Sequence, residues 1–168
     1  LGVGIGACAG GGDGARQSAT RAAQVDSLAD AYWATYLDIN PEEGTASGVP
    51  TADHARIRDN SVAALGREHE RLDRLRTATL AIDPAALEGT PQEVTYAVLR
   101  EALESEYERR ACRTELWGVA SYVNGWQAIY TDLALLQPVG TDSLRTAALA
   151  RARALPGYID TEMANLRE

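Results

Sequence analysis

The chain has 168 residues, of which 45% are apolar and 24% are charged, and its formal net charge is −8 at pH 7. These values are typical of one globular domain and argue against a disordered segment. The negative charge repels phosphate backbones, so we expect no nucleic acid among the partners. All the basic residues are Arg, so no Lys is present to form a Schiff base. No apolar run reaches the roughly 18 residues that a membrane-spanning helix needs.

Residues 1–14 resemble the end of a bacterial lipoprotein signal followed by a tether. Apolar and small residues precede Cys8, as in a lipobox, and a Gly-rich run follows it. We therefore expect Cys8 to be lipidated, the membrane to be a partner through this anchor, and the protein to be lipid-anchored in the cell envelope or secreted. No Met and no positively charged leader precede this run, so we expect the chain to be truncated at its front. The alternative is a disordered Gly/Ala tail with an incidental Cys.

In the second expected segment, residues 15–168, apolar residues recur mostly at helical spacing. The first helix is expected to stop near Pro41, because a Pro disfavours helical geometry in the residue before it. A Gly/Thr/Ser loop over 42–50 and a second helix over about 52–80 are expected next. Three aromatic residues of the first helix match its buried stripe and are interpreted as core rather than as a binding platform: Tyr32, Trp33 and Tyr36.

The clearest helix start is the run Thr90-Pro91-Gln92-Glu93. Thr90 is expected to cap, Pro91 suits the first helical position, and Glu93 can reach back to the N–H of the cap. This helix is expected to run to about residue 111. Its predicted inward-facing residues are Val94, Val98 or Leu99, Leu103 and Tyr107.

Three further helices are expected over about 126–136, 141–155 and 158–166, because Pro138 ends the first of them and Pro156-Gly157 breaks or kinks the second. No segment alternates apolar and polar residues with a period of two, so no strand is predicted. The sequence therefore predicts an all-α fold of about six amphipathic helices in a meandering bundle.

No complete catalytic or metal-binding motif is present. His69-Glu70 begins like H-E-x-x-H, but Asp73 stands where the second zinc-binding His is required. We interpret His69 as a packing residue, His54 as a solvated residue and Cys112 as a small buried residue. We therefore assign no catalytic residue and no metal ligand in this chain.

The acidic residues are also interpreted without a ligand role. Four of them lie around more than one face of their helix, interleaved with Arg, which is typical of a salt-bridged, solvated surface: Glu101, Glu104, Glu106 and Glu108. Asp38, Glu42 and Glu43 surround Pro41 and are interpreted as helix-end and turn residues.

The segment 115–130 differs from the plain Ala/Leu/Arg/Glu helices around it, since it interleaves Trp, Tyr, Asn and Gln with Gly. Aromatic rings offer apolar faces and amides offer a donor and an acceptor, which suits contact with a ligand. The predicted substrate-binding residues are Trp117, Tyr122, Asn124, Trp126 and Gln127. Packing against a neighbouring part of the protein is the alternative.

Four runs of the chain, in this order and spacing, resemble the N-terminal part of the bacterial domain-of-unknown-function family 885. They are residues 32–48 (YWATYLDINPEEGTASG), 82–104 (IDPAALEGTPQEVTYAVLREALE), 115–127 (ELWGVASYVNGWQ) and 152–168 (ARALPGYIDTEMANLRE). Each run alone is a common helical string. The resemblance as a whole covers nearly everything after the tether.

The resemblance implies a larger helical, zincin-like fold, because members of the family are secreted or lipoprotein chains that carry H-E-x-x-H late in the sequence. On this basis the chain is the substrate-cleft region of a cell-envelope metallopeptidase-like hydrolase and is inactive alone. Zinc is expected in the full-length parent, with the missing C-terminal catalytic half as partner and a peptide-like substrate. The alternative functions are a small lipid-anchored binding or scaffold module without catalysis, and a purely structural helical bundle.

Overall fold

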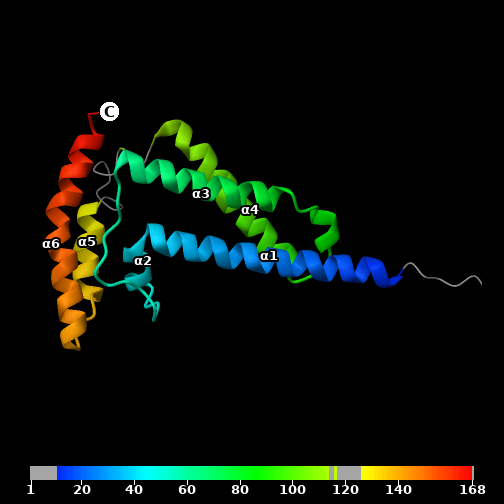
Figure 1. The fold of residues 1–168 in the computed structure, drawn as a ribbon, viewed down its shortest axis with the longest axis horizontal. Coiled ribbons are helices and arrows are strands. Elements are labelled where there is room, and N and C mark those ends of the chain that lie inside the picture. Colours follow the sequence, from blue (N-terminus) through cyan, green and yellow to red (C-terminus); the bar gives the residue numbers. More distant parts are fainter. Residues whose placement is uncertain (1–10, 114–115, 117–125, 168) are drawn as a thin grey trace, which may run out of the picture.

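The computed structural model describes residues 11–113, 116 and 126–167, and this part of the chain is all-α, as predicted (Figure 1). It contains six α-helices: α1 (Gly11–Ile39), α2 (Pro41–Ala46), α3 (Val62–Leu80), α4 (Gln92–Arg109), α5 (Trp126–Leu136) and α6 (Asp142–Asn165). Two short 3-10 turns, η1 (Pro84–Leu87) and η2 (Arg110–Cys112), flank α4. The described helices include none that is long and apolar enough to cross a membrane.

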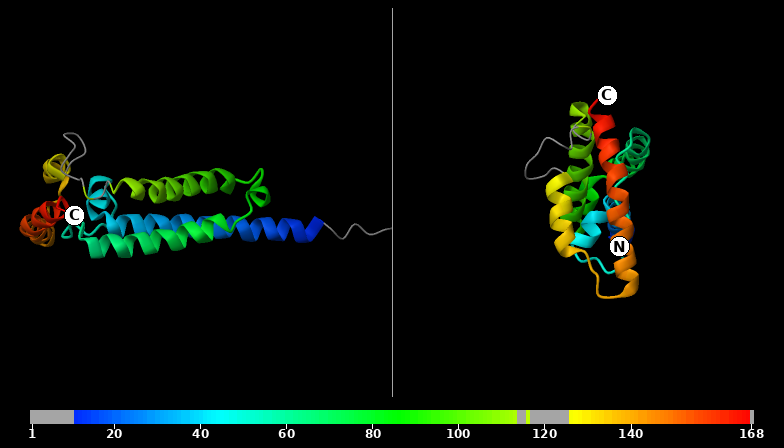
Figure 2. Two further views of the ribbon diagram at one scale, coloured as in Figure 1. Left: turned by 90° about the horizontal axis from the view of Figure 1, so that it is seen from above. Right: turned by 90° about the vertical axis from the view of Figure 1, so that its left-hand side faces the viewer.

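Helices α1, α3 and α4 lie side by side, each in contact with the other two, and form an elongated three-helix bundle (Figures 1 and 2). Two apolar clusters hold it together. The first contains Val25, Ile82, Leu87 and Tyr96, and the second contains Leu72, Leu99 and Leu103. Leu28 of α1 packs against both clusters, so the two form one continuous apolar interior.

Helices α5 and α6 lie across one end of this bundle, where α2 contacts α5 (Figures 1 and 2). The junction differs in chemistry from the bundle interior. Its buried residues include Glu42, Thr45, Asn60, Arg151 and Glu162, all of them polar or charged. Buried polar groups are stable only when they are hydrogen-bonded, so the attachment of α5 and α6 depends on specific polar contacts.

The first helix ends before Pro41, as predicted, although it begins at Gly11 rather than near residue 15. The predicted loop over 42–50 was wrong in its first half, because Pro41 starts the short helix α2. Pro suits the first helical position, and the carboxylates of Glu42 and Glu43 in the first turn favour the helix N-terminus.

The predicted start of the second long helix near residue 52 was also wrong. Ser61 caps α3, since its hydroxyl accepts the N–H of Ala64 at 3.2 Å, and residues 51–60 are irregular. Asp53 accepts the N–H of Ala55 and Asp59 accepts the N–H of Ser61. Such local side-chain bonds to the backbone compete with helix formation.

Helix α4 starts at Gln92, close to the predicted position, but its contacts differ from the prediction. The Glu93 carboxylate accepts the N–H of Gly89 at 3.0 Å rather than that of Thr90. The inward face is Tyr96, Leu99 and Leu103. Of the predicted alternatives Val98 and Leu99, Leu99 is the buried one, whereas Val94 and Tyr107, also predicted to face inward, are exposed. Apolar residues at helical spacing occur on two sides of α4, and packing against α1 and α3 selects one of them.

Helix α6 runs through Pro156, so of the two predicted alternatives at Pro156-Gly157, a break or a kink, the break was wrong. Pro removes one helical hydrogen bond, which usually kinks or ends a helix. Residues beyond Pro156 remain tied to the fold, since the rings of Tyr158 and Tyr130 meet edge to face at 5.4 Å and Glu162 and Asn165 are buried. These contacts explain why the helix continues.

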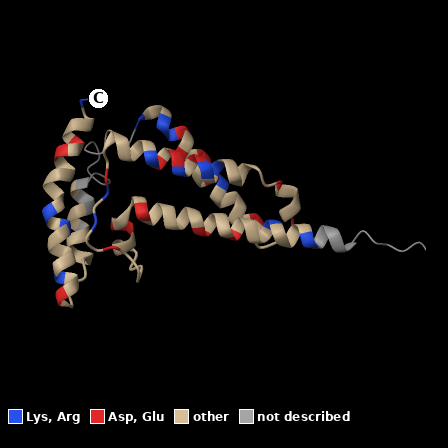
Figure 3. Ribbon diagram, in the orientation of Figure 1, with Lys and Arg blue, Asp and Glu red and all other residues tan. Residues whose placement is uncertain are grey.

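Acidic and basic residues are interspersed along α3 and α4 (Figure 3). Arg76 pairs with Glu104 at 2.6 Å, and Arg109 pairs with Glu106 at 2.5 Å. The interpretation of the acidic residues of α4 as a salt-bridged surface is confirmed for Glu104 and Glu106. Two interpretations of packing were wrong, because Cys112 is exposed and the Trp33 side chain is 48% exposed.

Candidate binding site between α5 and α6

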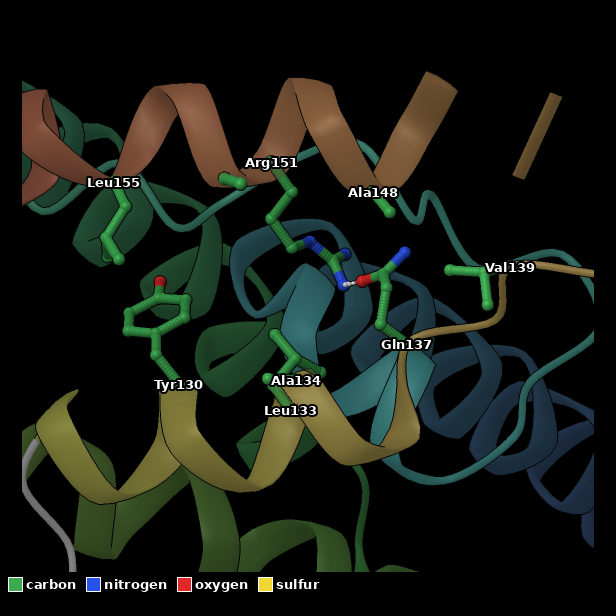
Figure 4. A pocket seen from close by; sticks show the side chains of 9 residues that line it. Tyr130, Leu133, Ala134, Gln137, Val139, Ala148, Arg151 and Leu155 are labelled. Carbon is green, nitrogen blue, oxygen red and sulfur yellow. Dashed lines mark hydrogen bonds between the residues drawn. The ribbon is translucent and has the colours of Figure 1, made fainter. Parts of the chain in front are cut away.

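A pocket of about 320 Å³ lies between α5 and α6 (Figure 4). Six of the described residues that line it are apolar: Leu133, Ala134, Val139, Ala148, Ala152 and Leu155. The other three are Tyr130, Gln137 and Arg151. Ligand sites in proteins are typically concave and largely apolar, with a few polar groups that fix the orientation of the ligand. The pocket has this composition.

Arg151 extends from α6 toward the end of α5 and is 5% exposed. Its guanidinium donates four hydrogen bonds, to the carbonyls of Arg56 (2.7 Å) and Asp53 (2.7 Å), the hydroxyl of Thr45 (3.0 Å) and the amide oxygen of Gln137 (2.7 Å). These acceptors belong to α2, the irregular segment 51–60 and the residue after α5. Arg151 therefore connects three parts of the chain to α6.

All four acceptors of Arg151 are neutral, and Arg151 takes part in none of the ion pairs among the described residues. Burial lowers the pKa of the Arg151 guanidinium from its ordinary value, and the fields of Glu42 and Asp53 oppose this shift only in part. The guanidinium stays charged at neutral pH, because the ordinary pKa of Arg is far above this range.

Glu42 of α2 is also buried. Its Oε1 atom accepts the hydroxyl of Tyr130 at 2.7 Å and the backbone N–H of Arg58 at 2.7 Å. The interpretation of Glu42 as a turn residue was therefore incomplete, because its carboxylate joins α2 to α5. Burial, followed by the nearby charge of Glu42, raises the pKa of the Tyr130 hydroxyl above its ordinary value.

A second polar cluster fixes the last turns of α6. Glu162 is 1% exposed, and its Oε1 atom accepts the side-chain amide of Asn60 at 2.6 Å. The side-chain amide of Asn165 donates to the carbonyl of Asn60 at 2.8 Å. Burial and the interaction with Glu162 raise the pKa of the Tyr158 hydroxyl. The C-terminal end of α6 is thus held by segment 51–60, which also provides two of the acceptors of Arg151.

A family model, described as bacterial protein of unknown function (DUF885), matches residues 41–168. The chain belongs to the DUF885 family. No curated protein and no solved structure matches the chain. The match begins at Pro41, the first residue of α2, so it includes every residue that lines the α5–α6 pocket and every partner of Arg151.

Most of the predicted substrate-binding residues of this DUF885 chain, and the predicted lipidation site, lie in stretches that the structure does not describe: Cys8, Trp117, Tyr122 and Asn124. Trp126 begins α5, but its side chain is outside the described part. Gln127 is exposed on the first turn of α5, and its carbonyl accepts the Thr131 hydroxyl at 2.8 Å. Their predicted role in substrate binding stays a prediction.

The two His residues do not assemble a metal site with other described residues. No group of three or more His, Cys, Asp or Glu able to hold a metal occurs in the described ranges. The prediction that His54 is solvated was wrong, because its Nδ1 atom lies 3.0 Å from the Thr45 hydroxyl and its carbonyl accepts the Gln137 amide at 3.1 Å.

Inspection of single motifs did not identify Glu42, Gln137 or Arg151 as site residues. The helical period contains a signal for one of them. Leu144, Ala148, Arg151 and Leu155 follow one another at intervals of three and four residues, which places Arg151 on the inner face of α6. A charged residue on the inner face of a helix is a candidate buried polar group.

Proposed function

We propose that this chain forms a substrate-binding wall of a cell-envelope metallopeptidase-like hydrolase, and that it binds peptides without cleaving them by itself. The observation that carries this proposal is the α5–α6 pocket, whose apolar walls and polar Tyr130, Gln137 and Arg151 suit one residue of a peptide. A volume of about 320 Å³ is within the range of small-ligand sites.

The polar groups of the pocket favour binding over proton transfer. Arg151 cannot act as a base at neutral pH. The raised pKa of Tyr130 keeps its hydroxyl protonated, and this hydroxyl donates to Glu42. Gln137 is an amide without acid–base chemistry in this range. The pocket therefore supplies shape and hydrogen-bond donors, which are the contributions of a substrate wall.

The sequence that leads into α5 extends the proposed wall. Gln127 is exposed at the start of α5, four residues before Thr131 and on the same helix as the pocket residue Tyr130. We propose that Gln127 and Asn124 hydrogen-bond a peptide backbone, while Trp117, Tyr122 and Trp126 provide apolar contacts. In this proposal the peptide continues from the pocket along the N-terminal end of α5.

The catalytic chemistry is proposed to come from elsewhere in the parent protein. The 168 residues contain no H-E-x-x-H, and resemblance to the metallopeptidase-like members is the basis for expecting one. Bound zinc would there supply a Lewis acid that activates water. We further propose that Cys8 anchors the protein in the cell envelope through a lipid.

The proposal is tested by measuring peptide binding and cleavage together. Fluorescence anisotropy reports binding of a labelled peptide mixture to the purified chain, and mass spectrometry reports whether the peptides stay intact. We expect binding without cleavage. Any longer open reading frame that includes these residues and an H-E-x-x-H should give a product that cleaves the same peptides. A lipid-anchored module without catalysis is favoured if no such reading frame exists and binding persists.

A matched pair of variants locates the binding. Ala152→Trp places a large ring in the pocket, whereas Ala150→Trp places the same ring on an exposed position of the same helix. We expect Ala152→Trp to weaken peptide binding at least about tenfold through steric exclusion, and Ala150→Trp to leave it unchanged. Equal affinity of the two variants, or cleavage by the 168-residue chain alone, would contradict the proposal.

A further inference from the structure

Arg151 is a buried cation, and none of the ion pairs among the described residues includes it. Its guanidinium is 5% exposed and is held by two backbone carbonyls, one hydroxyl and one amide oxygen. Transfer of a charge from water into a protein interior is costly, and buried charges in proteins are usually paired with an opposite charge. These hydrogen bonds provide acceptors for N–H groups of the guanidinium, but the acceptors are neutral and do not balance its positive charge.

The nearest groups of opposite sign are engaged elsewhere. The Glu42 carboxylate accepts the Tyr130 hydroxyl and the Arg58 N–H. Asp53 accepts the backbone N–H of Ala55. Arg58, the other guanidinium of this region, has its own carboxylate partner in Glu68 at 2.8 Å. Among these groups Arg151 is therefore the cation that lacks an ion-pair partner, and it lines the pocket.

Arg151 and Gln137 also have N–H groups that donate none of these hydrogen bonds. A guanidinium has five N–H groups, and four of them donate the bonds given above. The side-chain amide of Gln137 has two N–H groups, of which one donates to the carbonyl of His54. Figure 4 shows the guanidinium of Arg151 and the amide of Gln137 side by side at the pocket. By this count, one N–H of each group donates to no acceptor among the described residues, and the two oxygens of a carboxylate are acceptors that such a pair of donors can bind.

We propose that the α5–α6 pocket binds an apolar residue that carries a free carboxylate, with the carboxylate on Arg151 and Gln137 and the apolar side chain against Leu133, Val139 and Leu155. This inference rests on the proposed function, because it makes the ligand the carboxyl-terminal residue of a peptide. The pocket then distinguishes a chain end from an internal peptide segment, since an internal residue has no negative charge for Arg151.

The test compares two ligands that differ only in this charge. Acetyl-Ala-Ala-Leu with a free carboxylate and the same peptide as its carboxamide are titrated into the intact chain by isothermal titration calorimetry at pH 7. We expect the acid to bind at least about tenfold more tightly, because charge-assisted hydrogen bonds in a desolvated site are stronger than neutral ones. Equal affinities would overturn the carboxylate inference and leave the substrate-wall proposal standing. Absence of binding by both peptides would overturn both.

Variants at Ala148, which lines the pocket, provide a second test without removing Arg151. Ala148→Asp places an internal carboxylate on the face of α6 that holds Arg151, one turn away. We expect this variant to lose the preference for the acid, while Ala148→Asn, which has nearly the same shape, keeps it. Ala150→Asp adds the same charge at an exposed position and should also keep it.

The result that contradicts the inference is a preference that survives in Ala148→Asp or disappears equally in Ala148→Asn. Circular dichroism and thermal melting show which variants are folded. If Ala148→Asp is unfolded, the comparison of acid and carboxamide on the unmodified chain decides the question.

Discussion

The hydroxyl of Tyr130 donates a hydrogen bond of 2.7 Å to the carboxylate of Glu42, which joins α5 to α2 across 88 positions of the chain. Glu42 is buried, and its second contact is the backbone N–H of Arg58. The α5–α6 end of the molecule is thus attached to the three-helix bundle through a buried carboxylate and its donors. Interactions of this kind are sensitive to the loss of one partner.

Tyr130→Phe tests this attachment by removing only the hydroxyl. The change leaves the Glu42 carboxylate with one donor fewer in a buried site, so we expect a loss of about 1–3 kcal/mol in the free energy of unfolding. Urea denaturation followed by circular dichroism measures the loss. Tyr107→Phe is the matched control, because this side chain is exposed and its ring lies against Arg76. A change of more than about 0.5 kcal/mol in the control would show that hydroxyl removal is costly at any position.

The raised pKa values of Tyr130 and Tyr158 predict a loss of stability in alkaline solution. Both hydroxyls ionise near pH 10 when the chain is unfolded and only at higher pH when it is folded. Their contribution to stability is therefore complete below pH 10 and is lost as the pH rises above it, by up to about 1.4 kcal/mol per pH unit for each group. Urea denaturation between pH 7 and 11 should show this decline, with a shallower slope in the double variant Tyr130→Phe/Tyr158→Phe. Parallel slopes for the two proteins would be inconsistent with the burial of these hydroxyls.

Arg151→Ala removes the group that connects α6 to three other parts of the chain. The carbonyls of Asp53 and Arg56 lose the guanidinium as their donor, so we expect a loss of about 2–5 kcal/mol in the free energy of unfolding. Arg153→Ala, at an exposed position two residues away, should change it by less than about 0.5 kcal/mol. Chemical denaturation of both variants measures the difference. Similar stability of the two would argue that Arg151 does not hold this junction.

Local sequence signals were sufficient for the helical content and for several helix ends. The helix before Pro41 stops at Ile39, and Thr141 caps α6 through the N–H of Leu144 at 3.2 Å. These features depend on residues within one turn of each other, so a short window of sequence contains their cause. The all-α class follows for the same reason, because the helical period is repeated along each segment.

The buried polar junction depends on residues far apart in the chain and could not be predicted in the same way. Arg151 and Thr45 are 106 positions apart, and Asn60 and Glu162 are 102 positions apart. An isolated Arg or Glu on a helix is normally a surface residue, and the helical period that places Arg151 on the inner face of α6 does not identify its partners. Only the placement of α6 beside segment 51–60 brings these groups together and encloses them.

The continuity of α6 makes a prediction about Pro156, which is exposed within this helix. Replacement by Ala restores a backbone N–H for the helical hydrogen bond and removes the clash of the proline ring, so Pro156→Ala should raise the free energy of unfolding by about 1–3 kcal/mol. Thermal and urea denaturation measure the gain. If α6 were broken at Pro156, the substitution would restore no helical hydrogen bond and would not raise the free energy of unfolding. An unchanged or lower free energy of unfolding would therefore favour a broken helix.

Hydrogen exchange of the chain with and without acetyl-Ala-Ala-Leu, read by mass spectrometry, tests the central claim most directly. The claim is that the α5–α6 pocket holds a peptide without cleaving it. We expect slower exchange in segments 130–139 and 148–155, which contain the residues that line the pocket, together with recovery of the intact peptide. Unchanged exchange in both segments, or recovery of a cleaved peptide, would contradict the account.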